Sequence, residues 1–542
     1  MNITCLGAAR TVTGSSYLVE LDDKRCFLVD CGMYQGGKMI EARNWLDQPY
    51  RVNDIEAILI THAHIDHSGL VPRLVRLGYR GPVYASRPTC DLLKILWLDS
   101  AHIQEMEASW QSRKNNRQGR REIEPLYITE DAENAAALLQ PVELDQELEP
   151  LAGVTARFIP AGHILGAASL YLNLPNSHGS HHVGFSGDLG RPGQLIVPDA
   201  EHMPRPQAVF METTYGARRH KSLVESQKEL VDVIEEAYAQ GGKVLIPAFA
   251  VERTQEIIYT LSQAYRDGKL PKDMPVFLDS PLAIRATEIF RNHPEFFDEE
   301  AQAILAQGYK PFDFPNLTFT LTTDESRAIN NHRGPAVIMA GNGMASAGRI
   351  KHHLKHNLWR PETHVVIVGF QAKGTTGRLL VEGARRVKIF REDVAVAAKV
   401  HTIGGFSAHA DQEELLGWLS NLVHPGLMVY LIHGEEASSR EFRRVASQRF
   451  PEVDFHIPAW KEVLEIGKPA AGRSAARRAG TPPPPPEGSP LDGLVRRLAS
   501  LQGRLRRQGS DADPAVLAAM EEALASAEAA LGAEASAGGE GA

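Results

Sequence analysis

The residues with the clearest chemical potential lie in one short run, His-Ala-His-Ile-Asp-His at residues 62–67. The run follows the apolar residues 57–60, so a strand ending there would deliver His62, His64, Asp66 and His67 to one point. Imidazole nitrogen and carboxylate oxygen are ligands that suit zinc. Four such groups exceed what one tetrahedral site with an open position needs, which indicates two metal ions side by side. Two adjacent metals can activate a water and stabilise the oxygens of a phosphoryl displacement.

Further candidate ligands share one setting, a His or Asp that comes just after an apolar strand and beside a glycine. They are His163, Asp188 and His433. Glycine at such a point lets the backbone turn sharply and approach a metal closely. Asp188 could bridge two metals because a carboxylate has two oxygens. Asp30 closes the apolar run 27–29, where it suits a carboxylate that orients metal ligands or water, with a capping or turn role as the alternative.

A second group of histidines lacks this setting. His352, His353 and His356 lie in a polar run with helical character and no neighbouring glycine. We expect them on a solvated surface rather than in a second metal site.

Composition places the chain among globular proteins with more than one domain, since it has 542 residues, 43% hydrophobic and 23% charged. No apolar run approaches the ~20 residues that span a bilayer, and no basic region with an apolar core begins the chain. Four cysteines without a close CxxC pair indicate reduced thiols. We therefore expect a cytoplasmic protein with no membrane contact. The net charge of −9 argues against non-specific nucleic-acid binding but does not exclude a nuclease, because metals and local Arg and Lys can reverse the sign inside a cleft.

The order of strands and candidate ligands predicts an insertion. Residues 1–205 alternate short strands with helices, whereas residues 206–385 form a second α/β block with all-apolar strands at 244–247, 276–279, 336–339 and 365–368. Such strands indicate a buried parallel sheet. Residues 386–467 return to strand-rich sequence that carries His409 and His433. Because candidate ligands stand on both sides of the middle block, we expect it to be inserted into the first fold, with the metal site at the seam.

The tail differs in composition from the rest. Residues 468–490 are rich in Ala, Gly, Arg and Pro and include five consecutive prolines, which predicts a semi-rigid linker. Residues 491–542 carry two short leucine seams, one basic and one acidic, typical of amphipathic helices. We expect a helical or partly disordered tail that either folds on itself or mediates self-association, for example in a homodimer.

The motifs around these residues resemble those of a known family. The Thr-His-Ala-His-Ile-Asp-His run, with His163, Asp188 and the Val-Asp-Cys-Gly that holds Asp30, is similar to the metallo-β-lactamase superfamily. The middle block resembles the β-CASP nucleases. Motif A is similar to residues 210–216 around Glu212, motif B to residues 404–411 around His409, and motif C to residues 431–435 around His433. The resemblance covers about residues 1–467 in family order. It implies an α/β fold, a metallo-β-lactamase αββα sandwich with an inserted β-CASP α/β domain.

The resemblance also implies a division of labour. The site would hold two zinc ions, each bound by three residues. The ligands of the first zinc would be His62, His64 and His163, and those of the second would be Asp66, His67 and His433. Asp188 would bridge them, and manganese is an alternative metal for these ligands. The water activated there would attack phosphorus. His409 would protonate the leaving oxygen, and Glu212 would orient the His409 ring and keep it charged. His409, Glu212, Asp66 and Asp30 would then form the catalytic set.

A histidine in motif C resembles the RNA-processing branch of the family, which includes the 3′-end-processing endonuclease of eukaryotic pre-mRNA and ribonuclease J. The DNA-repair branch tends to have an apolar residue there, so His433 implies single-stranded RNA as the substrate. Glycine-rich elements of the middle block are candidate phosphate contacts, with plain turns as the alternative for the glycines. These candidates are Gly341, Gly343, Gly348, Arg349 and Arg378. The basic run 113–121 would line an RNA path or form a solvated loop.

The leading hypothesis is a zinc-dependent ribonuclease that acts as an endonuclease, with 5′-exonuclease action also open. The long carboxyl-terminal domain expected of ribonuclease J is not evident, which favours the endonuclease-like relatives. A hydrolase of small esters or thioesters on the same metal core is an alternative, against which the insert with His409 and Glu212 argues. A catalytically silent scaffold subunit is a second alternative, against which the complete ligand set argues.

Overall fold

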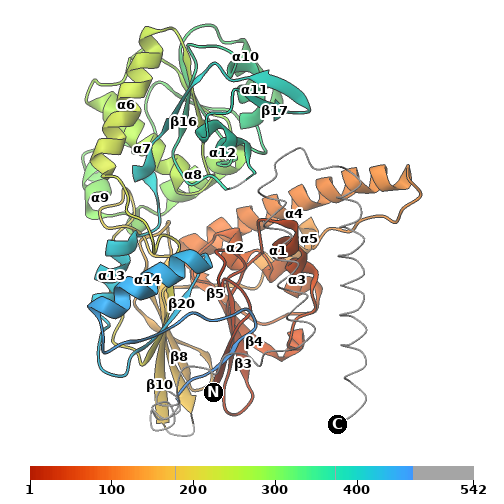
Figure 1. Cartoon of the computed structure of the whole chain (residues 1–542), viewed down its shortest axis with the longest axis vertical. Helices are drawn as coiled ribbons and strands as arrows, with labels where there is room; N and C mark the ends of the chain where they lie inside the picture. Colours follow the sequence, from red (N-terminus) through yellow and green to blue (C-terminus); the bar gives the residue numbers. More distant parts are fainter. Residues whose placement is uncertain (177–178, 373, 468–542) are drawn as a thin grey trace, which may run out of the picture. The chain divides into compact units, whose positions relative to one another are not determined.

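A computed structural model describes residues 1–176, 179–372 and 374–467 (Figure 1). The linker and tail expected for residues 468–542 lie outside this range. Among the described residues, the helices are either too short or too polar to cross a membrane. Three large sheets organise this part of the chain.

The first sheet has the order β22-β1-β2-β3-β4-β5-β6. Strands β1, β2 and β3 pair antiparallel, whereas β3, β4, β5 and β6 run parallel. The carboxyl ends of β3 and β4 therefore meet at one edge, where the candidate ligands begin. The strands are β1 (Asn2–Cys5), β2 (Ser16–Glu20), β3 (Cys26–Cys31), β4 (Ile55–Leu59), β5 (Val83–Ser86), β6 (Leu139–Val142) and β22 (Val463–Glu465).

The second sheet has the order β21-β20-β11-β10-β9-β8-β7. Its first half is an antiparallel meander from β7 to β10, and β10, β11, β20 and β21 run parallel. Strands β11 and β20 are adjacent although more than two hundred residues separate them, because the chain leaves this sheet and returns. The strands are β7 (Glu147–Leu151), β8 (Val154–Pro160), β9 (Ala168–Asn176), β10 (Gly179–Phe185), β11 (Ala208–Glu212), β20 (Met428–Ile432) and β21 (Asp454–His456).

Alternation along the strands holds the two sheets face to face. In β3, Phe27 and Val29 belong to the core between the sheets, whereas Leu28 packs against the helices outside. Successive side chains of a strand point to opposite faces, so one strand serves two cores. Phe185 of β10 and Phe210 of β11 stack in the inner core with their centroids 4.7 Å apart.

Helices cover both outer faces of the sandwich. The first sheet packs against α3 (Val71–Arg76), α4 (Arg87–Asn116) and α5 (Thr129–Ala136), and the second against α13 (Gln412–Ser420) and α14 (Glu436–Arg449). The layer order helix-sheet-sheet-helix confirms the expected αββα sandwich. Figure 1 shows α14 lying across the front of the second sheet.

The third sheet is entirely parallel and has the order β14-β13-β15-β12-β16-β19. Helices lie on both faces, as the all-apolar strands require. Its strands are β12 (Lys243–Pro247), β13 (Val276–Leu278), β14 (Leu317–Phe319), β15 (Ala336–Ala340), β16 (His364–Ile367) and β19 (Lys399–Thr402), with the hairpin β17 (Arg386–Ile389) and β18 (Glu392–Ala395) beside it. Its helices include α6 (Leu223–Ala239), α7 (Arg253–Arg266), α8 (Pro281–Asn292), α10 (Thr323–Asn331), α11 (Ile350–Asn357) and α12 (Thr376–Val381).

This sheet extends past residue 385, where we placed the end of the inserted block. Strand β19 pairs in parallel with β16, and the hairpin β17–β18 packs into the same core. The sequence Lys-Val-His-Thr of β19 is an edge strand and lacks the all-apolar signal of the central strands. We therefore propose that the inserted block ends near Thr402.

Candidate metal centre

The first group of ligand atoms gathers at the carboxyl end of β4. His62 follows the strand, and the single-turn helix α2 (Ile65–Ser68) begins directly after His64. His62 Nε2 lies 3.0 Å from His64 Nδ1, and His163 Nε2 lies 3.2 Å from the same atom. With Asp188 these three residues offer ligand atoms that all lie within 4.8 Å of one another. The structure thus brings together residues that are up to 126 positions apart in sequence.

A second group lies beside the first. His67 Nε2 is 3.0 Å from His433 Nε2, and Asp66 Oδ2 is 3.6 Å from that same nitrogen. Asp66, His67 and His433 form a compact set of candidate ligands. Asp66 and His67 come from α2, whereas His433 follows β20 on the other sheet. The site therefore lies where the two sheets of the sandwich meet.

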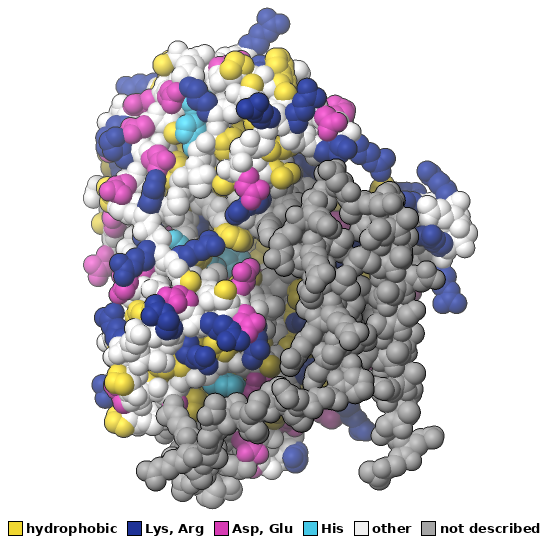
Figure 2. Space-filling view, viewed as in Figure 1, with side chains coloured by type: hydrophobic (Ala, Val, Ile, Leu, Met, Phe, Trp, Pro, Cys, Tyr) yellow, Lys and Arg dark blue, Asp and Glu magenta, His cyan; other side chains and the backbone are white. Residues whose placement is uncertain are grey.

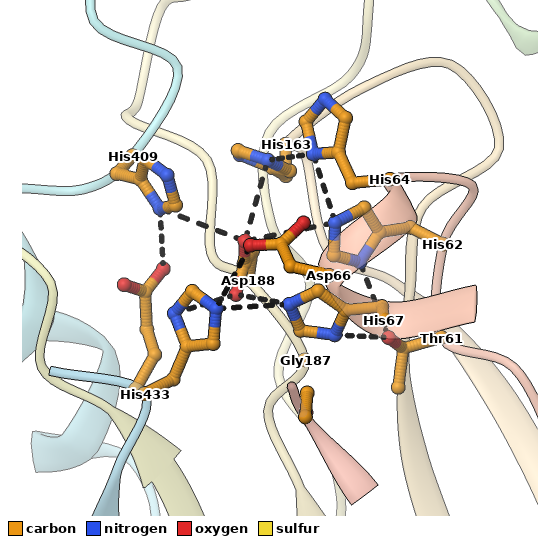
Figure 3. Close-up of polar contacts among 12 residues, drawn as sticks. Thr61, His62, His64, Asp66, His67, His163, Gly187, Asp188, His409 and His433 are labelled. Atoms are coloured by element: carbon orange, nitrogen blue, oxygen red, sulfur yellow. Dashed lines mark hydrogen bonds and ion pairs between the residues drawn. The ribbon is translucent and has the colours of Figure 1, made fainter. Parts of the chain in front are cut away.

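Asp188 stands between the two groups (Figure 3). Its Oδ2 faces His62 Nε2 and His163 Nε2, each at 3.6 Å. Its Oδ1 faces His67 Nε2 at 3.3 Å and His433 Nδ1 at 3.2 Å. One oxygen thus points to each group, which is the arrangement that a bridging carboxylate requires.

The donor set fits metal ions on two observations. Asp188 Oδ1 is buried yet has no properly oriented hydrogen-bond donor among the described residues, which is costly unless another positive group compensates it. The histidines of the first group are also held neutral. Burial, reinforced by neighbouring histidines, lowers the pKa of His62 and His163 well below its usual range, and burial lowers that of His64 to about 4. A neutral imidazole has the lone pair that a metal needs.

Asp30 lies behind the second group. Its Oδ2 is 2.7 Å from His67 Nδ1, so His67 can donate there while its Nε2 points at Asp188. The Thr61 backbone N–H and the Ser15 hydroxyl also donate to Asp30, at 2.8 Å and 3.2 Å. A carboxylate held in this way fixes the ring orientation and raises the basicity of the ligand. Sequence reasoning missed Thr61 and Ser15, because hydroxyl residues next to a strand carry no distinctive pattern.

Replacing Asp30 with asparagine should weaken metal binding without unfolding the protein. An amide keeps the shape but cannot accept from all the donors around it, and loss of such a partner typically costs about 10–100-fold in metal affinity. Competition with a metal-binding dye would measure this. Asp23→Asn, at a surface carboxylate paired with Arg25, is the matched control. Equal affinities in the two variants would show that Asp30 does not position His67.

His409 and Glu212 form a pair at the edge of the same site. His409 Nδ1 lies 3.3 Å from Glu212 Oε1 and 3.8 Å from Asp188 Oδ2. Glu212 ends β11 and is fully buried, and the Leu189 N–H donates to its Oε1 at 2.6 Å. Burial by itself would lower the pKa of His409, but the carboxylates of Glu212 and Asp188 outweigh it and raise the pKa to about 9. The imidazole is thus kept charged, and its side chain is 22% exposed and can reach a bound molecule.

His433 is fixed by contacts that the sequence did not reveal. Its backbone lies in the left-handed region with φ of 44°, and its N–H donates to Ala8 O at 2.7 Å. Thr214 Oγ1 lies 3.0 Å from His433 Nδ1. A side chain at Gly434 would collide with Thr213, since a Cβ there would lie 2.3 Å from Thr213 Oγ1. The glycine after the histidine is therefore needed for the close approach of two strand ends.

The candidate phosphate contacts divide into two kinds. A Cβ at Gly343 would touch the Phe249 ring at 2.8 Å, and Gly348 has φ of +71°, so packing and turn geometry account for both. These two positions favour the alternative of plain turns. Gly341 has no such requirement, and within the described part of the chain Arg378 has one ion pair, with Glu382 on the surface of α12. Gly341 and Arg378 stay proposed phosphate contacts.

Arg349 does not present a free guanidinium. Its Nη1 donates to Asp279 Oδ1 at 2.7 Å, and its Nη2 donates to Leu321 O at 2.7 Å. Asp279 is fully buried and also lies 2.7 Å from His353 Nε2. Burial would raise the pKa of Asp279, but hydrogen bonds, His353 first among their donors and Arg349 among them, lower it to about 2. These contacts favour a structural role for Arg349, and the phosphate role expected for it stays a prediction.

The same contacts correct the expectation for the histidines of α11. His353 is fully buried, between Asp279 and Asn330, whose Oδ1 lies 3.1 Å from His353 Nδ1. His352 and His356 lie in the same helix and are exposed, as expected. The helix thus turns one of its three histidines into the core, where polar neighbours from distant segments satisfy it.

Replacing Arg349 with alanine should destabilise the third sheet and its helices. It leaves Asp279 buried with one cationic partner fewer, and breaking a buried pair costs about 3–5 kcal/mol. We expect the lower end, because the arginine side chain is partly exposed. Arg378→Ala, which removes a surface pair worth less than about 1 kcal/mol, is the matched control. Thermal denaturation would compare the two variants. Equal midpoints, together with weaker RNA binding by Arg349→Ala, would favour the phosphate role of Arg349 instead.

Comparisons with known proteins agree with this geometry. The profile of the Metallo-beta-lactamase superfamily matches residues 9–234, and that of the Beta-Casp domain matches residues 254–380. A third profile, described as a Zn-dependent metallo-hydrolase RNA specificity domain, matches residues 393–458. The chain is 40% identical over 454 residues to Ribonuclease TTHA0252 of Thermus thermophilus, covering 84% of this chain and 97% of that protein.

A second relative is the Transcription termination factor FttA of Methanocaldococcus jannaschii. It is 31% identical over 478 residues, which covers 86% of this chain and 72% of that protein. The chain therefore belongs to the β-CASP family of the metallo-β-lactamase superfamily. This membership and the His/Asp cluster together define a metal-dependent hydrolase.

Proposed function

We propose that the protein is a zinc-dependent ribonuclease that hydrolyses phosphodiester bonds of single-stranded RNA. The observation that carries the proposal is the position of Asp188, with one oxygen toward each group of candidate ligands and His409 beside it. A simple metal-binding site would need no charged imidazole at its edge. A hydrolase that must protonate a departing oxygen does need one.

In this proposal His62, His64 and His163 would hold one zinc ion, and Asp66, His67 and His433 would hold the other. Manganese is an alternative, because these ligands accept both metals. When bound, two metals supply Lewis acidity that activates a water and stabilises negative charge on a phosphate. Asp188 would contribute one oxygen to each site, and Asp30 keeps His67 in the ligand orientation.

The pair of His409 and Glu212 supplies the proton. Glu212 is buried and anchored by the Leu189 N–H, so its carboxylate cannot swing away from His409. His409 then donates its proton to the oxygen that leaves phosphorus, and Glu212 stabilises the charge on the ring before that step. A positioned general acid contributes about 10²–10⁴-fold to such a rate.

RNA as the substrate is supported by three observations. The family profile described as a Zn-dependent metallo-hydrolase RNA specificity domain covers both His409 and His433. A relative with 40% identity is named a ribonuclease. His433 lies 3.0 Å from His67 in the second group of ligands, and the resemblance to RNA-processing members rests on a histidine at this position. Endonuclease action is our expectation, with 5′-exonuclease action as the variant that the experiment separates.

One assay tests the function and its direction. Zinc-loaded protein is incubated with an RNA labelled at the 5′ end, the same RNA labelled at the 3′ end, and a DNA of equal sequence. Internal RNA fragments with intact DNA would support an RNA endonuclease, and release of labelled mononucleotide from the 5′ end would support exonuclease action. Cleavage of DNA in preference to RNA would contradict the proposal. No cleavage of either would also contradict it and favour a hydrolase of small esters.

A further inference from the structure

A basic hollow lies on the face of α14, outside the metal centre. It is open to solvent, has a volume of about 160 Å³, and is lined by Arg10, Glu436, Arg440, Arg443, His456 and Ile457. Its residues come from three separate segments, the loop after β1, the helix α14 and strand β21 with the residue that follows it. Figure 2 shows Lys and Arg side chains gathered over α14 on this face.

Positive charge exceeds negative charge in this hollow. Glu436 is the single acidic residue among those that line it. Its Oε1 forms ion pairs with Arg440 Nη2 at 2.5 Å and with Arg10 Nη1 at 3.6 Å. The Arg443 side chain has no hydrogen bond or ion pair among the described residues. Two guanidinium groups thus share one carboxylate while the third has no partner there, and the planar fork of arginine suits the oxygens of a phosphate.

The hollow is joined to the metal centre through a short loop. The His433 N–H donates to Ala8 O at 2.7 Å, and the Gly434 N–H donates to Thr11 O at 3.2 Å. Arg10 lies between Ala8 and Thr11, with φ of 58°, and its Nη2 donates to Ile457 O at 3.4 Å. Arg440 and Arg443 lie in α14, less than three helical turns after His433 in the sequence. The loop that contacts the backbone of His433 and Gly434 thus also supplies Arg10 to the hollow.

We propose that Arg10, Arg440 and Arg443 form a phosphate-binding subsite for the RNA backbone outside the catalytic cleft. The inference rests on the proposed ribonuclease function. An open hollow with surplus charge suits a polymer that passes over it better than a small anion that must be enclosed. Proteins that bind single strands without reading sequence use such charged surfaces to follow the backbone.

Substitution of Arg443 tests the subsite, because this arginine has no partner whose loss could disturb the fold. Arg443→Ala is prepared in a zinc-loaded His409→Ala background, and binding of a single-stranded RNA is measured over a range of salt concentrations. Affinity should fall roughly tenfold, as expected when one charge-assisted contact is lost. The salt dependence should become shallower by about one released ion. Arg443→Lys should recover part of the affinity by keeping the charge.

Arg444→Ala is the matched control, since Arg444 neighbours Arg443, pairs with Glu441 and does not line the hollow. Equal RNA affinity and salt slope in the Arg443→Ala and Arg444→Ala proteins would overturn the subsite while leaving the ribonuclease proposal intact. Weaker binding of inorganic phosphate with unchanged RNA affinity in Arg443→Ala would overturn the assignment to RNA. Failure of the parent protein to bind any RNA would overturn the proposed function and the subsite together.

Discussion

Replacing Asp188 with alanine is expected to remove the metal and the hydrolytic activity together. Asp188 directs one oxygen to His62 and His163 and the other to His67 and His433. Without it, the imidazoles of the two groups lose the carboxylate that faces them both. We expect cleavage of RNA to fall to background and bound zinc to fall below detection after gel filtration.

The metal content of the purified variant, measured by mass spectrometry, checks this expectation. Asp232→Ala, which removes an exposed carboxylate paired with Lys228, is the control and should keep its metal and activity. Circular dichroism would show that Asp188→Ala is folded. A folded Asp188→Ala protein that retained its full metal content would contradict the bridging role.

Replacing His409 with alanine should reduce turnover while the metal stays bound. His409 belongs to none of the compact groups of candidate ligands, but its ring lies within reach of Glu212 and Asp188. Loss of a general acid costs about 10²–10⁴-fold in rate. Single-turnover cleavage of RNA would measure the step, with His202→Ala, at an exposed histidine near Asn421, as the control.

A second substrate separates proton donation from a structural role. A nitrophenyl phosphodiester has a leaving group that departs without a proton, so the defect of His409→Ala should largely disappear on it. The defect should persist if the substitution merely distorts the metal centre. An equal loss of rate on both substrates would therefore remove His409 as the general acid.

Much of the candidate site was visible in the sequence because its residues follow strands. The spacing of His and Asp in the run 62–67 indicates a metal site. His163, Asp188 and His433 each stand beside a glycine after an apolar strand. Parallel strands end at one edge, so residues at strand ends converge when the sheets form. The structure brings all of them within hydrogen-bond or ion-pair distance of a neighbour in the same cluster.

The remaining features depend on contacts between distant segments. The ion pair of Arg349 with Asp279 was not predicted, because Asp279 lies 70 positions earlier and gave no local signal. The polar helix around His353 predicted a surface residue, but His353 is buried against the same Asp279 carboxylate. Strand β19 was missed because an edge strand is only half buried and needs no apolar run.

The number of metal ions that activity requires tests the account most directly. Metal-free protein would be titrated with zinc, and at each point bound zinc per chain and the rate of RNA cleavage would be measured on the same sample. The account predicts that activity follows the second ion and reaches its maximum at two ions per chain. Full activity with one ion per chain, or cleavage by metal-free protein, would contradict it.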